Sequence, residues 1–335
     1  MSSRFAHVWL LLVLLIPSAL LTSLQHDLTN HAWPANLILP GYAAGEVSRE
    51  MLGTAPASIV QARCLVRGVL RLCLTVGGPH LEGYNLAVQF AAAWAALGLV
   101  YAAAARVVPP FAAGGAVLLA TVYVPWGFLS VGYAASWPYD LPSLAFAALG
   151  TWAILARRFV PFALALTLGT LNKETVVFLL PAYLLAMWPC LPRRAWLAQA
   201  LILAAAFALA YEVPRIAYTR QHLPTATFSA YDQGPRWAAN LGHLRLHVQG
   251  LPLENIYWAF TLHLAPLLGW RTLPRGLRAL YACAPVLLVP LFFVGNVYEL
   301  RLYNELIPAG AVATVLVGWR RLAQPLASKE PRSVE

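Results

Sequence analysis

Several charged side chains border or interrupt long apolar stretches, where ionisable residues are rare and commonly functional. Asp27 follows the first apolar stretch, and a partly desolvated carboxylate at that depth could act as a general base. Lys173 and Glu174 interrupt another apolar region within the sequence Asn-Lys-Glu-Thr. Plainer alternatives stay open at both places, because Asp27 could cap a short helix, and Lys173 and Glu174 could have partners in a structural ion pair.

Two further groups could recognise a substrate. Glu299 and Arg301 lie in a short polar connection before Pro308, where Arg301 could bind an anionic lipid headgroup while Glu299 orients it. Asp140 opens an apolar stretch and could face the same space. Alternatively, Asp140 is the N-cap of a helix that has a proline in its first turn.

Arginine recurs at four-residue spacing between the first two apolar stretches. Arg63, Arg67 and Arg71 lie among leucines and valines within residues 57–76, and this pattern predicts an amphipathic helix along the membrane surface. The guanidinium groups could extend to lipid headgroups without a further role. They could instead bind a phosphate of a lipid-linked substrate, because the guanidinium fork matches phosphate oxygens.

The elements that must position these residues are membrane helices. Of the 335 residues, 60% are hydrophobic and 11% are charged, against about 25% charged in a typical soluble domain, which excludes a water-soluble globule. The net charge of +10 does not indicate nucleic acid as a partner, because Lys and Arg lie in short loops between apolar runs. The four cysteines are too sparse for a disulfide scaffold, and no convincing set of metal ligands is present.

Stretches free of Asp, Glu, Lys and Arg predict about ten transmembrane helices in an all-α, multi-pass membrane bundle. They are 5–26, 83–105, 107–139, 141–156, 159–172, 175–192, 195–211, 255–270, 279–298 and 306–319. The first could be a signal peptide, but its long apolar run and the nine stretches after it favour an uncleaved helix. Residues 159–192 could form either one long helix with buried charge or a hairpin of two short helices.

The distribution of basic residues favours the hairpin. With a hairpin and a cytoplasmic N-terminus, 13 of the 23 basic residues lie inside, whereas a single span leaves nine inside. In the ten-helix arrangement, eleven of the thirteen acidic residues lie on the outer face and both termini are cytoplasmic. We therefore expect one polytopic domain over 1–323, with outer loops at 25–82 and 212–254, and a short, disordered cytoplasmic tail over 324–335.

Together these residues resemble the GT-C class of polytopic membrane glycosyltransferases, and most closely its uncharacterised bacterial members. The resemblance lies in the layout of a first helix, a long outer loop with an acidic residue and a surface helix, and many short spans. It also lies in the Asn-Lys-Glu-Thr tip at 172–175 and in Glu299, Arg301 and Pro308. The chain departs from the class in having a single acidic residue, Asp27, where two adjacent ones are common, so any dependence on a divalent metal stays undecided.

The resemblance implies a sugar transferase of the bacterial cytoplasmic membrane, with membrane lipids around it, a polyprenyl-phosphate sugar as donor and an envelope acceptor. Asp27 would be the base, and Arg301, with Lys173 or the arginines at 63, 67 and 71, would balance the leaving phosphate. Glu299, Glu174 and Asp140 would complete the substrate site. The alternatives are a transporter or lipid flippase, and a non-catalytic assembly subunit such as a degenerate relative of the class.

The hairpin makes a direct topological prediction. A reporter fused after Glu174 should report an external location, and one fused after Arg194 should report a cytoplasmic location. Paired alkaline phosphatase and fluorescent-protein fusions in a bacterial host would measure both sites. The reverse pattern would contradict the hairpin topology.

Overall fold

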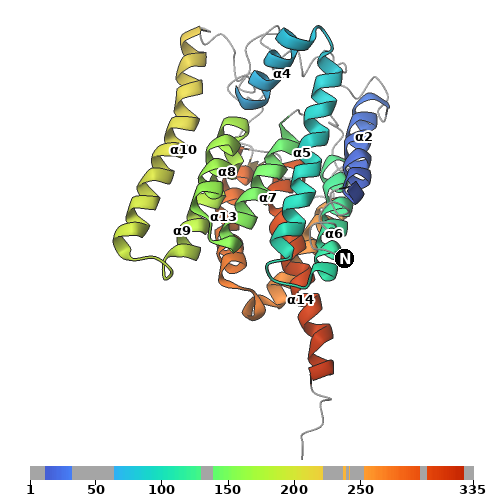
Figure 1. The fold of residues 1–335 in the computed structure, drawn as a ribbon, viewed down its shortest axis with the longest axis vertical. Helices are drawn as coiled ribbons and strands as arrows, with labels where there is room; N and C mark the ends of the chain where they lie inside the picture. Colours follow the sequence, from blue (N-terminus) through green and yellow to red (C-terminus); the bar gives the residue numbers. More distant parts are fainter. Residues whose placement is uncertain are drawn as a thin grey trace, which may run out of the picture.

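Helices form the framework of the chain (Figure 1). The computed structural model describes residues 12–31, 64–129, 139–221, 237–238, 241, 253–294 and 300–327. Every regular element in this part is helical, as predicted. The α-helices are α2 (Leu15–His31), α4 (Cys64–Gly77), α5 (Leu81–Ala104), α6 (Pro110–Leu129), α7 (Asp140–Ala156), α8 (Phe159–Asn172), α9 (Leu179–Met187), α10 (Arg193–Gln221), α12 (Leu253–Leu268), α13 (Arg275–Val294) and α14 (Ile307–Ala327). The 3-10 helices are η2 (Glu174–Phe178), η4 (Trp270–Thr272) and η5 (Leu300–Leu306).

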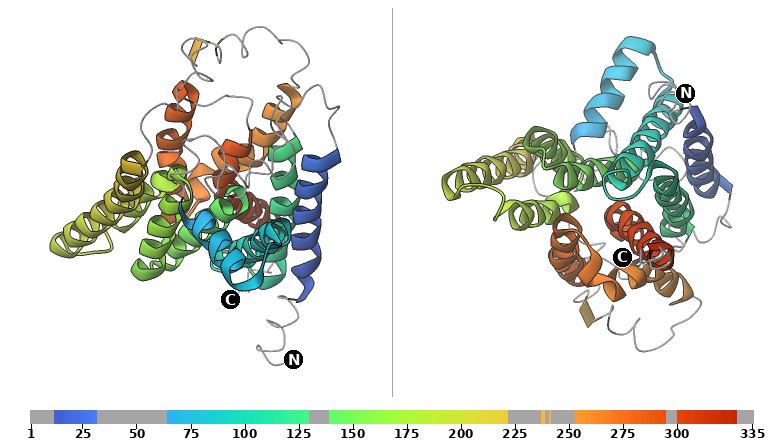
Figure 2. Two further views of the ribbon diagram at one scale, coloured as in Figure 1. Left: turned by 90° about the horizontal axis from the view of Figure 1, so that it is seen from above. Right: turned by 60° about the horizontal axis from the view of Figure 1, so that its bottom comes forward.

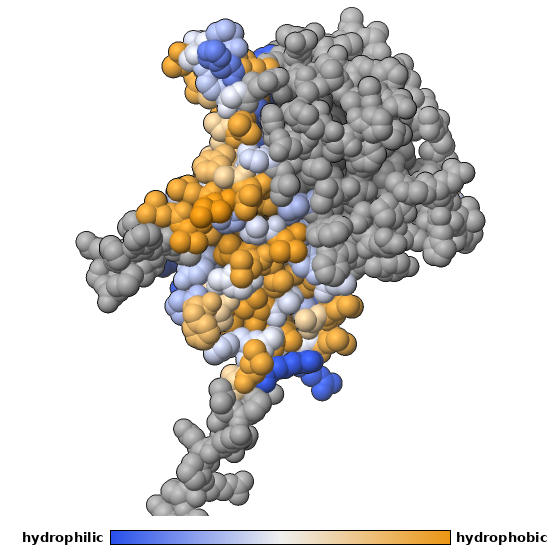
Figure 3. All heavy atoms as spheres, turned by 90° about the vertical axis from the view of Figure 1, so that its right-hand side faces the viewer, coloured by the Kyte–Doolittle hydropathy of each residue, from blue (hydrophilic) through white to orange (hydrophobic). Residues whose placement is uncertain are grey.

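Several helices have the length and composition of membrane spans. Within the described part of the chain, four segments are long and apolar enough to cross a bilayer: Gly83–Ala104, Arg193–Ala217, Arg275–Phe293 and Tyr303–Ala323. Four apolar helices are shorter: Pro110–Pro125, Asp140–Ala156, Phe159–Asn172 and Glu174–Met187. Figure 3 shows hydrophobic residues gathered mainly at the middle height of one face, with hydrophilic residues above and below. These features fit a helical membrane protein.

Each of the ten charge-free stretches contains an α-helix, but three helices end later than predicted. α2 continues to His31, α10 to Gln221 and α14 to Ala327, so both predicted outer loops and the predicted tail are shorter. An isolated charge does not end these helices. Glu and Arg are good helix formers with long side chains that can reach water, and a single Asp costs a helix less than about 0.7 kcal/mol. The predicted surface helix is present as α4 from residue 64, and residues 57–63 lie outside the described part.

The region 159–192 is a hairpin, which was one of the two predicted alternatives. Phe162 near the start of α8 stacks on Tyr183 near the end of α9, with ring centroids 4.1 Å apart, so the two helices run antiparallel. The chain leaves α8 at Lys173, whose backbone is extended at φ −161° and ψ 128°. A Cβ on Gly150 of α7 would lie 2.6 Å from the Leu179 side chain, so glycine permits the close approach of α9.

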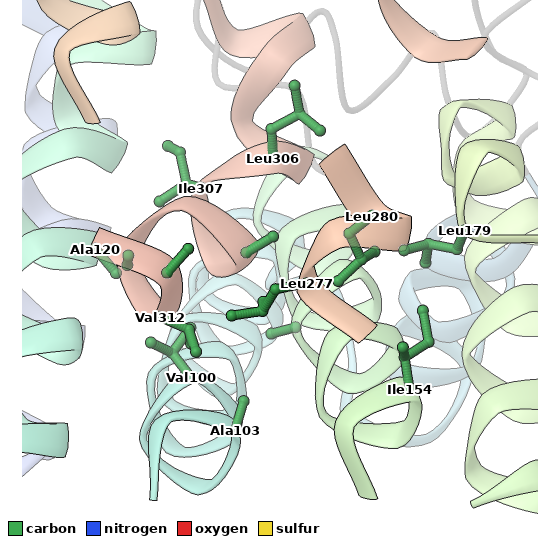
Figure 4. Packing of buried hydrophobic residues seen from close by; sticks show 14 of the residues in the cluster. Val100, Ala103, Ala120, Ile154, Leu179, Leu277, Leu280, Leu306, Ile307 and Val312 are labelled. Atoms are coloured by element: carbon green, nitrogen blue, oxygen red, sulfur yellow. The ribbon is translucent and has the colours of Figure 1, made fainter. Parts of the chain in front are cut away.

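α7 is strongly enclosed, whereas α10 lies at the periphery. Eleven of the 17 residues of α7 are buried, and it packs against α5 and α8. α10 contacts α8 and α9 at the edge of the bundle (Figure 2). One continuous apolar core joins most of the described helices, and α5, α7, α13 and α14 contribute Val100, Ile154, Leu280 and Val312 to it (Figure 4).

A hydroxyl group compensates for a proline inside α12. Pro266 has no backbone N–H, so the carbonyl of Leu262, four residues earlier, loses its helical donor. The Thr314 hydroxyl of α14 donates a hydrogen bond of 2.6 Å to this carbonyl. Unpaired carbonyls are unfavourable in apolar surroundings, and neighbouring Ser and Thr side chains commonly satisfy them in membrane helices.

Thr314→Val should therefore destabilise the bundle, because it leaves the Leu262 carbonyl unsatisfied at nearly unchanged volume. We expect a loss of about 1–2 kcal/mol, measured as a lower midpoint of thermal unfolding in detergent. Thr121→Val is the matched control, since the Thr121 hydroxyl donates to the Val117 carbonyl within its own helix, α6. Equal midpoints for the two variants would contradict this role of Thr314.

Candidate functional site

A buried lysine joins three segments at one end of the bundle. Lys173, at the junction of α8 and η2, places its Nζ atom 3.2 Å from Oδ1 of Asp140 and 3.0 Å from Oε1 of Glu305. Asp140 opens α7, and Glu305 lies in η5. All three side chains are only 1% exposed. Residues far apart in the sequence therefore form one ion-paired network.

Local structure supports these charges. Transferring a charged group out of water is costly unless it is paired and hydrogen-bonded. Asp140 lies in the first turn of α7, where the positive end of the helix dipole favours a carboxylate. The Tyr139 ring centroid is 6.0 Å from Nζ of Lys173, within the range of a cation–π interaction.

Hydrogen bonds extend the network to the tip of the hairpin. The Thr175 hydroxyl donates to Oε1 of Glu305 at 2.6 Å. The side-chain amide of Asn172 donates to the carbonyl of Tyr139 and to the hydroxyl of Ser143, both at 2.8 Å. We call Asp140, Asn172, Lys173, Thr175 and Glu305 the Lys173 cluster. In the described part of the chain, Oδ1 of Asn172 and Oε2 of Glu305 are buried acceptors with no hydrogen-bond partner.

α4 packs beside this cluster. Its buried residues Val66 and Leu70 form a small apolar group with Tyr139, the residue that precedes Asp140. Tyr84 of α5 packs against the same group. Arg67 of α4 is half-buried and Arg71 is exposed. The predicted arginine helix therefore lies next to the ion network. It contains two of the three predicted arginines, Arg67 and Arg71.

The structure brings together some of the predicted site residues. Asp140 and Lys173 are ion-paired, and Glu174, which follows Lys173, is half-buried. The N-cap position of α7 is occupied by Tyr139, so the alternative of Asp140 as a helix cap is wrong. Lys173 forms a buried ion pair, as one alternative held, with Asp140 and Glu305 as partners.

Glu305 is the member of the network that sequence reasoning missed as a site residue. It ends a short polar connection and precedes the apolar part of α14, so it resembles any carboxylate at the edge of a span. The available signal was its place, because Glu305, like Asp140, directly precedes a charge-free stretch, where a carboxylate could balance the charge of Lys173.

For the other predicted residues, either the whole residue or its side chain lies outside the described part. Asp27 belongs to α2, which continues to His31, so it lies within a helix and not in the loop that follows; its side chain is outside the described part. Figure 1 shows the His31 end of α2 at the same end of the bundle as α4. Arg301 belongs to η5 without a described side chain, and Arg63 and Glu299 are outside the described residues.

The pairing of Lys173 argues against its predicted contact with a phosphate. Its ammonium group already faces two carboxylates, and the three side chains sum to one negative charge. An anion approaching them would be repelled by the carboxylates and would have to displace them from Nζ. Of the predicted phosphate ligands, the arginines at 63, 67, 71 and 301 remain.

Comparisons with protein-family models, with curated proteins and with solved structures find no match. The described residues contain no group of three or more His, Cys, Asp or Glu side chains that could hold a metal ion. The chemistry of the site therefore has to be argued from its own geometry and charge.

Loss of the lysine should test the network as a unit. Lys173→Met leaves two buried carboxylates without their cation, so we expect a loss of about 3–5 kcal/mol, seen as a lower midpoint of thermal unfolding in detergent. The triple variant with Asp140→Asn and Glu305→Gln should recover most of this loss, because no charge is left unpaired.

Arg106→Met is the control for removing a positive charge, since Arg106 is exposed. The Arg106→Met variant should have the same midpoint of thermal unfolding as the native protein. A Lys173→Met protein as stable as this control would contradict the structural importance of the ion pairs.

Proposed function

We propose that this chain is a GT-C-like integral membrane glycosyltransferase of the bacterial cytoplasmic membrane. It transfers a sugar from a polyprenyl-phosphate donor to an envelope acceptor at the outer face. The observation that carries the proposal is the Lys173 cluster, which joins the tip at 172–175 to Asp140 and to the connection that contains Arg301. The tip and the connection that contains Arg301 are segments on which the resemblance to the GT-C class rests.

The proposed topology has ten spans with both termini in the cytoplasm. Basic residues are more numerous on the cytoplasmic side, and the acidic residues gather on the outer side together with the Lys173 cluster. α8 has 14 residues and is about 21 Å long, less than the ~30 Å of a typical hydrocarbon core. In this topology the cluster at the end of α8 lies just below the outer membrane surface. The phosphate of a lipid-linked sugar lies near the same level.

Asp27 acts as the base in this proposal. It accepts the proton of the acceptor hydroxyl, whose oxygen forms a bond to the anomeric carbon of the sugar. The bond between that carbon and the phosphate oxygen breaks, its electron pair leaves with the lipid phosphate, and the configuration inverts. Support for this assignment is the place of Asp27 near the His31 end of α2, at the same end of the bundle as α4.

Arginine side chains balance the charge on the leaving phosphate. Arg67 and Arg71 are one turn apart on α4, a helix of 14 residues without Asp or Glu, and Arg301 lies in η5. Planar guanidinium groups suit phosphate oxygens, and their charge is retained in apolar surroundings. The Lys173 cluster then holds the surrounding segments in place without binding the phosphate.

Asp27→Asn should abolish transfer and leave folding intact. Loss of a general base lowers the rate by about 10²- to 10⁴-fold. The test is mass spectrometry of envelope glycans and lipid-linked sugars in a deletion strain that carries the native chain, Asp27→Asn or Glu212→Gln. Glu212 is exposed on α10 and serves as the matched acidic control.

We expect the native chain and Glu212→Gln to restore the glycan, and Asp27→Asn to leave the lipid-linked donor accumulating. Equal rescue by Asp27→Asn, at equal protein level, would dismiss Asp27 as the base. Purified protein that moved a lipid or solute across vesicles without forming a new bond would replace the transferase by a transporter.

A further inference from the structure

η5 is a short 3-10 helix that is tied to the rest of the molecule through Glu305. The hydrogen-bond geometry of 3-10 helices is poorer than that of α-helices, so runs longer than about four residues are uncommon. Oε1 of Glu305 accepts a hydrogen bond from the Thr175 hydroxyl and also forms an ion pair with Lys173. Both donors belong to the tip of the α8–α9 hairpin. The hairpin tip therefore helps to fix this end of η5, which continues directly into α14.

The tie is close to an arginine on the same element. Arg301 precedes Glu305 by four residues in η5, which corresponds to about 8 Å along a 3-10 helix. η5 also packs against α6 and α7, so its position is defined on more than one side. A displacement of Glu305 would shift Arg301 as well, because the two residues share one short, continuous helical element.

We propose that Glu305, through its contacts with Thr175 and Lys173, is a positioning residue that holds Arg301 for the phosphate group of a polyprenyl-phosphate lipid. This proposal rests on the proposed function, since the role of Arg301 is part of it. Lys173 and Thr175 act on the substrate only through η5. Buried ion pairs are weak sources of stability compared with apolar packing, but they specify geometry when every partner is fixed.

A merely structural network and a positioning network differ in what they change. The first affects only folding, whereas the second affects phosphate affinity and does so through Arg301. Thr175→Val separates the two, because it removes one hydrogen bond to Glu305 at similar volume and leaves every charge in place. Thr170→Val is the matched control, since the hydroxyl of the buried Thr170 donates only to the Leu166 carbonyl within α8.

The experiment measures binding of a polyprenyl monophosphate to the full-length protein in lipid nanodiscs. Thr175→Val should weaken binding about tenfold, as expected for loss of a hydrogen bond to a charged group, while Thr170→Val binds as the native protein does. Thr175→Ser, which restores the hydroxyl, should restore the affinity. Hydrogen–deuterium exchange over residues 300–306 should be faster in Thr175→Val than in the native protein, and unchanged in Thr170→Val and Thr175→Ser.

A double-mutant cycle with Arg301→Gln tests whether the effect passes through Arg301. Arg301→Gln should itself weaken binding, and adding Thr175→Val should weaken it no further, because the positioned group is already gone. Additive losses would overturn the proposal. So would native affinity in Thr175→Val accompanied by faster exchange, since the network would then be structural only.

The binding assay also separates this proposal from the proposed function. Native protein that binds the polyprenyl monophosphate but transfers no sugar would overturn the transferase activity, and the cycle would still decide the role of Glu305. Native protein that shows no binding would overturn the positioning proposal and the lipid-phosphate donor together. A third outcome is that Thr175→Val transfers sugar, binds the polyprenyl monophosphate with native affinity and shows unchanged hydrogen–deuterium exchange. This outcome would overturn the positioning proposal and leave the proposed function in place.

Discussion

The ammonium group of Lys173 must have counter-charges, because it is almost fully buried among apolar helices. This requirement links the start of α7, the tip of the α8–α9 hairpin and the end of η5, since Asp140 and Glu305 both reach Nζ. A shift of any one of these segments would leave charge unpaired in surroundings of low dielectric constant. The position of the hairpin tip is therefore determined by charge pairing as much as by packing.

Apolar packing and hydrogen bonding adjust to that pairing. The extended backbone of Lys173 ends α8 and directs its side chain toward its partners, while Asn172 donates to the carbonyl of Tyr139 and to Ser143. Below the tip, Gly150 lets Leu179 come close enough for α9 to pack on α7. Polar residues thus specify the geometry at one end of the bundle, and small residues allow the helices to close behind it.

The positions of helices could be predicted from the sequence, because ten charge-free stretches each contain one. Their ends could not, since a single Glu212 or Asp27 does not stop a helix whose neighbours are apolar or good helix formers. The ion pairs were also beyond a single sequence. The contact between Thr175 and Glu305 spans 130 residues, and the identity of such a partner depends on which helix ends meet in space.

Finding the partners of Lys173 changes the chemistry that its charge can do. The resemblance to the GT-C class was the reason to expect Lys173 at a phosphate, and an isolated buried lysine would indeed attract an anion. With two carboxylates beside Nζ, the charge of Lys173 is already balanced within the protein, so in the proposed function arginines bind the phosphate. Arginine is well suited to this task at a membrane surface, because its guanidinium stays charged and presents several donors to a phosphate. The proposed division between a lysine that holds the fold and arginines that bind the substrate rests on this difference in pairing.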